Sequence, residues 1–581
     1  MTQTSNDLPE SQPLSTAARL LWIILILSTL YLCYFQNLGS LGLVGPDEPR
    51  YAWIARDMQE TGDYITPRLY GKPWFEKPPL YYWSAALSFK FFGVSETSAR
   101  LPSAVCALLA TLALAWLALR LYGADTARWL LLLLPTTVGM IGFSHAAATD
   151  MPFAAMLTIG MVFAAGILGI VDPQGFAIYT PKFSFYTNTR LADLTSLVFF
   201  GFFLGLAVLA KGPAAIILSG GAVLLWAVFT KRWRNAFRCL HPVAITGFCL
   251  TALPWYILCA RRNPDFFRVF IIEHNFNRFL TPQFQHVQPL WFYLPVVLIA
   301  FLPWTPLLIV SAFFGTLKVW HERKLSPANT FFFCWSLFCL LFFSVSKSKL
   351  PGYILPAIPA IGVLLARCQV SLMPLFAKYF RSLLALFGSV FAVAGALLYL
   401  FLGSLHASSL TRASRAVALI LLMFSFANWL LASRKTKLDS RVPVAACCVL
   451  PVLLLAGYVP KLMPAIFPYD PSGKTLAAEI ISTSVSSDLF VGPINRGQHF
   501  SLNFYLHREI KDWDKETPAE GYLLMRSRLC RLEVSSPWTC SIDPIELPKS
   551  GWFIYRVQPD SSFRGLGGGN AGSGLSDRHP R

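Results

Sequence analysis

The sequence has little charge. Only 14% of its 581 residues are Asp, Glu, Lys or Arg, whereas soluble domains average about a quarter. Hydrophobic residues make up 55%, and the mean hydropathy is +0.52. This composition excludes an ordinary soluble domain and indicates a membrane protein.

The sequence also lacks the alternating segments of about 10 residues that are typical of a membrane β-barrel. It has repeated apolar runs of about 17 to 25 residues, long enough to cross the bilayer as helices. No small-residue cleavage site follows the first run, so we expect that run to stay as an anchor. We predict about 13 spans, at 18–36, 101–121, 127–143, 151–171, 194–210, 213–230, 242–260, 289–312, 329–346, 350–368, 383–403, 415–433 and 443–458.

The net charge of +19 does not indicate nucleic acid binding, because the basic residues gather in short loops between apolar runs. An excess of Lys and Arg marks cytoplasmic loops. A cytoplasmic leader at 1–17 places the basic loops inside and the C-terminus outside. The basic residues are Arg120, Arg128, Lys231, Arg232, Arg234, Arg238, Lys318, Arg323, Lys324, Lys378, Arg381, Arg434, Lys435, Lys437 and Arg441.

This topology requires that residues 79–93 lie along the membrane surface. The segment has only about 15 residues, and Lys90 interrupts it, whereas a spanning helix needs about 20 apolar residues. It belongs to a predicted outer juxtamembrane loop at 38–100 of the membrane domain, 18–458. If it crossed, every later loop would change sides.

After the last span the sequence becomes mixed and polar. Short β-like runs at 488–491, 521–525 and 552–557 alternate with helical stretches near 475–482 and 500–507. We predict a small periplasmic α/β domain at 459–563. The tail at 564–581 is rich in Gly and Ser, and we expect it to be disordered.

No paired Cys or His spacing typical of a metal site occurs. Ten of the 12 cysteines lie in or beside apolar runs, where a buried thiol is the simplest interpretation. Cys530 and Cys540 lie in the C-terminal domain, which this topology places in an oxidising compartment. An intervening Ser-Ser-Pro turn predicts a disulfide between them, and two separately buried thiols are the alternative.

The first outer connection carries adjacent carboxylates, Asp47 and Glu48, followed by Arg50 and Tyr51. Charges beside a membrane helix are costly unless they are used or solvated. We predict that Asp47 and Glu48 are catalytic and that Arg50 and Tyr51 bind substrate. A solvated loop or a helix cap is the alternative for the two carboxylates.

The same connection ends with Glu76 and Lys77 among prolines and aromatic residues, including Tyr82. Anchoring at the lipid headgroups explains the aromatic residues but not the charged pair.

Later outward turns add further charge. Asp150 begins a spanning segment, where an N-cap is the alternative role, and Lys211 lies between two apolar runs, where snorkelling is the alternative. The outer loop 261–288 and the segment 344–353 add His274, Arg278, Lys347, Lys349 and Tyr353.

The predicted topology brings these carboxylates and cations to one face. A pocket with several cations favours an anion, and the phosphate of a membrane lipid is available there. Fixed cations would stabilise the charge that develops on a departing phosphate oxygen. A carboxylate could accept the proton of an incoming hydroxyl or orient an incoming phosphate.

Five motifs occur in order along the membrane region: Asp-Glu-x-Arg-Tyr-Ala (47–52), Phe-Glu-Lys-Pro (75–78), Asp-Met-Pro (150–152), Lys-Gly (211–212) and Ser-Lys-x-Lys-Leu-Pro-x-Tyr (346–353). Together they resemble the motifs of the bacterial lipid A aminoarabinose transferase family. That family belongs to the polyprenyl-phosphate-sugar-dependent membrane transferases.

The resemblance implies an all-α polytopic glycosyltransferase of GT-C type in the bacterial inner membrane, with a periplasmic active site. It implies Asp47 as the leading catalytic carboxylate and Asp150 as a second, with Lys77, Lys211 and Tyr353 around the carrier phosphate. The donor would be an undecaprenyl-phosphate sugar, and the acceptor lipid A or another envelope molecule.

The sequence leaves other interpretations open. Residues 79–83 (Pro-Leu-Tyr-Tyr-Trp) are also found in the wider relatives, so protein O-glycosylation is an alternative, and transport of a lipid-linked sugar is a weaker one. We expect a monomer that needs no cofactor or metal, with Glu76 and His274 as candidate ligands of an adventitious zinc ion.

Overall fold

The computed structural model describes residues 15–171, 189–277, 288–322, 326–371 and 470–559, the last range with gaps at 484, 486–487, 517–519, 528–537 and 542, together with isolated helical positions between 388 and 457. The chain divides into two compact units. The first contains residues 1–41 and 51–466, and the second contains residues 42–50 and 467–581.

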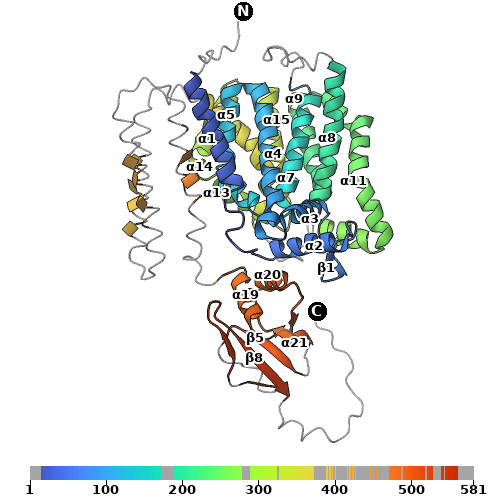
Figure 1. Cartoon of the computed structure of the whole chain (residues 1–581). Helices are drawn as coiled ribbons and strands as arrows, with labels where there is room; N and C mark the ends of the chain where they lie inside the picture. The colour runs from blue at the N-terminus through green and yellow to red at the C-terminus, as the bar shows by residue number, and fades with distance from the viewer. Residues whose placement is uncertain are drawn as a thin grey trace, which may run out of the picture. The chain divides into compact units, whose positions relative to one another are not determined.

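The first unit is a bundle of upright helices (Figure 1). Among the described residues, seven helices are long and apolar enough to cross a membrane, or nine if each of two bent pairs is one span. The long helices are α1 (Thr16–Tyr34), α4 (Glu96–Tyr122), α7 (Asp150–Ile167), α8 (Thr189–Lys211), α11 (Pro242–Arg262), α15 (Pro327–Val345) and the helix that η5 (Pro351–Ala357) begins.

Shorter elements complete this unit. They are α9 (Ala214–Thr230), α10 (Trp233–Phe237), η2 (Arg238–Leu240), the π-helix η3 (Arg268–Asn277) and η4 (Leu290–Phe292). The bent pairs are α5 (Ala124–Leu133) with α6 (Val138–Ser144), and η4 and α13 (Tyr293–Ala300) with α14 (Thr305–Glu322).

The first ten predicted spans coincide with these helices and bent pairs. Two of them are broken, at 127–143 by a bend of 63° and at 289–312 by a bend of 119°. Pro135 and Pro303 lie at the breaks, and proline lacks the N–H that continues a helix. The last three predicted spans, 383–403, 415–433 and 443–458, fall largely outside the described residues, so the count of 13 stays a prediction.

Small residues let the helices approach closely. Helix α8 packs against both α7 and α11. A Cβ at Gly201 would lie 2.0 Å from the Ala244 carbonyl oxygen, and one at Gly205 would lie 2.7 Å from the Thr251 Cβ. Glycines four residues apart on one helix face permit such contacts inside membranes.

The first connection contains α2 (Asp47–Thr61), β1 (Arg68–Leu69), β2 (Lys72–Pro73) and α3 (Leu80–Phe92). Strands β1 and β2 pair through a two-residue turn, Tyr70 and Gly71, with φ of 54° and 76°. Positive φ at both positions matches the twist of a tight hairpin. At 13 residues α3 is too short to span, and it packs against α4.

The second unit has a mixed sheet of order β4-β3-β5-β8-β6, with β7 also paired to β8. Strand β3 is parallel to β4 and β5, whereas β8 is antiparallel to its neighbours. Its elements are α19 (Lys474–Ser482), β3 (Leu489–Val491), α20 (Arg496–Leu506), β4 (Lys511–Asp512), α21 (Trp513–Glu516), β5 (Gly521–Met525), β6 (Trp538–Cys540), β7 (Ile545–Leu547) and β8 (Trp552–Pro559).

The core of the second unit joins its helices to its sheet. Leu476 of α19 and Leu502 of α20 pack with Leu524 of β5 and Ile554 of β8. The unit also contains residues 42–50, which lie in the predicted outer loop of the membrane domain. The domain bounds 459–563 stay a prediction.

Candidate functional site

The ends of two membrane helices bring a carboxylate and an amine together. Asp150 is the first residue of α7 and Lys211 is the last of α8, and Lys211 Nζ donates to Asp150 Oδ1 at 2.5 Å. The charges suit the helix dipoles, because the anion lies at a helix N-terminus and the cation at a C-terminus. Thr149 occupies the N-cap position, so the Asp150 carboxylate is paired with Lys211 instead of capping.

Aromatic rings surround the Lys211 ammonium. Its Nζ lies 5.0 Å from the ring centroid of Tyr353 in η5 and 5.6 Å from that of Phe153 in α7, within the range of a cation–π interaction. A Cβ at Gly352 would lie 3.1 Å from Asp150 Oδ1, so the chain passes close to the ion pair. Asp150, Lys211 and Tyr353 thus lie close together, and their roles in catalysis and at the carrier phosphate stay predictions.

A second ion pair follows the β1–β2 hairpin. Glu76 Oε1 and Lys77 Nζ lie 3.5 Å apart, with side chains 11% and 13% exposed. Tyr51 and Tyr82 are buried, and their ring centroids lie 5.8 Å apart. The two tyrosines therefore contribute to the packing of α2 against α3.

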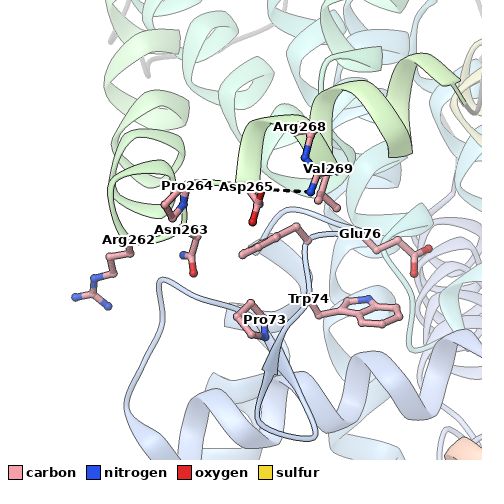
Figure 2. A pocket seen from close by; sticks show the side chains of 10 residues that line it. Pro73, Trp74, Glu76, Arg262, Asn263, Pro264, Asp265, Arg268 and Val269 are labelled. Carbon is pink, nitrogen blue, oxygen red and sulfur yellow. Dashed lines mark hydrogen bonds and ion pairs between the residues drawn. The ribbon is translucent and has the colours of Figure 1, made fainter. Parts of the chain in front are cut away.

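A cavity of about 460 Å³ adjoins this connection. Glu76 and Trp74 line one side, and residues of the turn after α11 line the other (Figure 2). Arg268 donates to Asp265 at 3.2 Å and to Glu273 at 2.7 Å. The lining residues are Pro73, Trp74, Phe75, Glu76, Arg262, Asn263, Pro264, Asp265, Arg268 and Val269.

Arg262, which lines this cavity, also pairs with a carboxylate of the first connection. Arg262 donates to Asp63 at 3.1 Å, and Arg68 bonds the same carboxylate at 3.3 Å. Burial by itself raises the pKa of Asp63, but hydrogen bonds from Ile65, Thr66 and Arg68, with the charge of Arg262, outweigh it and lower the pKa. The Asp63 carboxylate therefore links the segment after α2 to the end of α11.

The two lysines before η5 differ. Lys347 is exposed, whereas Lys349 is only 5% exposed. Lys349 Nζ donates to the carbonyls of Gln288 at 2.9 Å and Ser346 at 2.7 Å. Burial and then the charge of Lys347 lower the pKa of Lys349. Lys349 holds this loop together, and binding of the carrier phosphate by either lysine stays a prediction.

The remaining carboxylates lie in the second unit. Arg50 pairs with Asp47 three residues earlier, and Arg50 Nε donates to the Pro46 carbonyl at 2.8 Å. Arg50 is 4% exposed, whereas the Asp47 side chain is 51% exposed. Glu48 is buried and accepts the Val44 N–H at 2.8 Å. Glu48 thus shapes the start of α2, and Asp47 presents a half-exposed carboxylate held by a buried guanidinium.

Some predicted residues lie outside the described parts of the chain: Arg278, Cys530 and the side chain of His274. Within the described ranges, no group of three or more His, Cys, Asp or Glu could hold a metal. Cys540 forms a disulfide, and its predicted pairing with Cys530 falls on an undescribed residue.

Sequence reasoning missed Arg100. This side chain is 4% exposed and donates to the carbonyls of Leu38 at 2.8 Å and Leu41 at 2.7 Å. It therefore holds the chain just before residue 42. An arginine at the outward end of a predicted span opposes the usual charge bias, and that signal could have identified it.

Comparisons with known proteins agree with these observations. The sequence model of the dolichyl-phosphate-mannose-protein mannosyltransferase family matches residues 19–270. The undecaprenyl phosphate-alpha-4-amino-4-deoxy-L-arabinose arabinosyl transferase of Serratia proteamaculans is 30% identical over 448 residues, covering 75% of this chain and 76% of that protein. Its namesake from Enterobacter sp. is 30% identical over 436 residues, covering 73% and 74%.

The fold is similar to that of ArnT from Cupriavidus metallidurans, solved bound to undecaprenyl phosphate. The TM-score is 0.71 at 22% identity, covering 93% of this chain and 98% of ArnT. Identity and coverage together show that the chain belongs to the undecaprenyl phosphate-aminoarabinose arabinosyl transferase family and is a polytopic inner-membrane glycosyltransferase.

Proposed function

We propose that this enzyme transfers a sugar from undecaprenyl phosphate to a phosphorylated envelope acceptor such as lipid A, on the periplasmic face. The family relationship supports the reaction class. The observation that carries the chemistry is the pairing of Lys211 with Asp150, and of Lys77 with Glu76, in largely buried surroundings. Poorly solvated cations bind phosphate more strongly than cations in bulk water.

In the proposed reaction the bond between the anomeric carbon and the donor phosphate oxygen breaks, and a bond from that carbon to the acceptor oxygen forms. Lys211 and Lys77 bind the donor phosphate and stabilise the negative charge that grows on its departing oxygen. Tyr353 orients the phosphate beside Lys211. Arg278, His274, Lys347 and Lys349 are further candidates for substrate contacts.

Asp47 is the leading catalytic carboxylate in this proposal, as the resemblance implies. It accepts the proton of an incoming hydroxyl or orients an incoming phosphate. Asp150 acts as a second carboxylate, and Glu48 shapes the helix start beside Asp47. We propose that the enzyme works as a monomer. We also propose that it needs no metal, and restoration of activity by one specific metal after chelation would contradict this second proposal.

The direct test uses purified protein in lipid nanodiscs with an undecaprenyl-phosphate aminoarabinose donor and lipid A. We expect sugar-modified lipid A by mass spectrometry, and none with dephosphorylated lipid A. A second assay places the protein in lipid vesicles and follows the donor. Movement of the donor across the vesicle membrane, with no transfer to lipid A or to dephosphorylated lipid A, would support a transporter.

A protein acceptor is the second candidate, because the family model matching residues 19–270 describes protein mannosyltransferases. A parallel reaction with mannosyl donor and Ser/Thr-rich peptides separates the two. Glycopeptide without modified lipid A would favour this alternative.

The periplasmic placement rests on the basic loops. A reporter enzyme fused after Tyr458 should be active in the periplasm, and one fused after Arg234 should be active in the cytoplasm. A cytoplasmic signal from the Tyr458 fusion would mean that the span count is wrong.

A further inference from the structure

Helix α20 of the second unit forms hydrogen bonds with both backbone groups of Leu43, in the segment that leads to Asp47. The Leu43 N–H donates to the Tyr505 hydroxyl at 2.9 Å, and the Ser501 hydroxyl donates to the Leu43 carbonyl at 2.8 Å. Ser501 and Tyr505 are four residues apart, so they lie on the same face of α20. Leu43 and Ser501 are both fully buried, where hydrogen bonds gain strength.

The chain approaches the second unit too closely for side chains at two glycines. A Cβ at Gly42 would lie 2.0 Å from the Ser472 hydroxyl, and one at Gly497 would lie 2.8 Å from the Gly45 carbonyl carbon. Separations under 3 Å would force the backbone to move. The segment is therefore seated tightly on α20 and on the start of α19.

The contacts continue from Leu43 to the carboxylate of Asp47. Glu48 accepts the Val44 N–H, and Arg50 both donates to the Pro46 carbonyl and pairs with Asp47. The Arg50 guanidinium lies 5.3 Å from the ring centroid of Phe500, which also belongs to α20. Helix α20 thus supports Asp47 twice, through the backbone at Leu43 and through the arginine that holds its carboxylate.

We propose that Ser501, Tyr505 and Phe500 are positioning residues for the catalytic carboxylate Asp47, an inference that rests on the proposed function. The second unit is then a working part of the transferase, because it contains Asp47 and its helix α20 positions the segment that leads to this carboxylate. Misplacing a catalytic group by about 1 Å can cost about 100-fold in rate. Loss of these contacts should therefore lower kcat, because Asp47 acts in the transition state, and leave binding of the donor nearly unchanged.

The test compares two double variants of the full-length enzyme. The first, Ser501→Ala with Tyr505→Phe, removes both hydroxyls that bind Leu43. The control, Ser550→Ala with Tyr555→Phe, removes the same two groups elsewhere in the unit, where they donate to the carbonyls of Leu547 at 3.3 Å and Ser527 at 3.0 Å. The measurements are kcat, KM for the donor, melting temperature, and hydrogen exchange of the peptide 42–50.

We expect the first variant to lose at least tenfold in kcat with KM within twofold, and to exchange faster in the peptide 42–50. The control should have a similar fall in melting temperature with kcat within twofold. Ser501→Thr, which keeps the hydroxyl, should retain more activity than Ser501→Ala.

Asp47→Asn, measured in parallel, separates the two levels of the proposal. If Asp47→Asn is inactive while the first double variant keeps kcat within twofold, or if the control loses as much, the positioning role is wrong and the role of Asp47 stands. If Asp47→Asn turns over normally, the catalytic role of Asp47 is wrong, whatever the exchange data show.

Discussion

The two units hold their carboxylates by different means. In the membrane bundle, Asp150 is fixed by an ion pair between two helix ends, and the helices are fixed by small residues that allow close packing. In the second unit, Asp47 pairs with a buried arginine, and hydrogen bonds between α20 and Leu43 hold the segment that leads to it. The comparison shows that similar acid–cation pairs can depend either on apolar packing or on a polar network.

The largest expected effect is at Asp47. Asp47→Asn keeps the size of the side chain but removes the charge, and we expect transfer to fall by about 10²- to 10⁴-fold, the contribution of a positioned acid or base. Expression and the melting temperature should stay close to those of the wild type, because the side chain is half exposed. Initial rates with saturating donor measure the change.

The matching change in the bundle is Lys211→Met, which keeps the apolar stem and removes the ammonium. We expect kcat/KM to fall by about 100-fold, because one fixed group that stabilises transition-state charge contributes about this much. Lys90→Met, at the exposed end of α3, is the control and should stay within twofold. Equal rates for both variants would remove Lys211 from the phosphate site.

Removal of the disulfide should affect the stability of the second unit and not the catalytic groups. Cys540 is disulfide-bonded, and if Cys530 is its partner, Cys530→Ser should lower stability by roughly 2 to 3 kcal/mol, the chain-entropy value for so short a loop. Thiol labelling of denatured, unreduced protein measures the pairing directly. Labelling at position 530 without reductant would show that the partner is another cysteine.

The smallest effect concerns pH and Asp470, which receives hydrogen bonds from Ser472 and Thr475. Burial raises the pKa of this carboxyl, but the hydrogen bonds outweigh burial and hold the pKa below its ordinary value of 3.8. A depressed pKa contributes stability that is complete above this ordinary, unfolded-state pKa and is lost as the pH falls through the folded value.

Hydrogen exchange in α19 should therefore accelerate as the pH falls below about 4, after correction for the intrinsic exchange rate. The Asp470→Asn variant should lack this acceleration. The same acceleration in both proteins would assign the pH dependence to other groups.

The sequence predicts the bundle well because spanning helices need long apolar runs, and helices or bent pairs occupy the first ten predicted positions. It also places Asp150 and Lys211 at neighbouring outward ends. The breaks at Pro135 and Pro303 were missed, because proline is tolerated in many membrane helices and length alone does not show a bend.

The support of Asp47 could not be predicted. Leu43 and Ser501 are separated by 458 positions, and no local pattern relates a loop backbone to a hydroxyl so distant. The spacing of Asp47 and Arg50 permits an ion pair on a helix, but the sequence does not show the burial of Arg50 beside Phe500, which depends on the tertiary fold. Lys349 was likewise expected to face a ligand, and its bonds to two carbonyls depend on how the loop closes.

The seating of residues 42–50 in the second unit has a consequence for biosynthesis. Leu43 leaves the ribosome early, but its partner Ser501 is made 458 residues later. At synthesis rates of about 5 to 20 residues per second, this delay is roughly 20 to 90 s. During that time the membrane helices can insert while the Asp47 segment has no hydrogen-bond partners from α20. With Asp47 in its proposed role, a nascent or prematurely terminated chain would occupy the membrane without a positioned carboxylate, and activity would begin only when the second unit is complete.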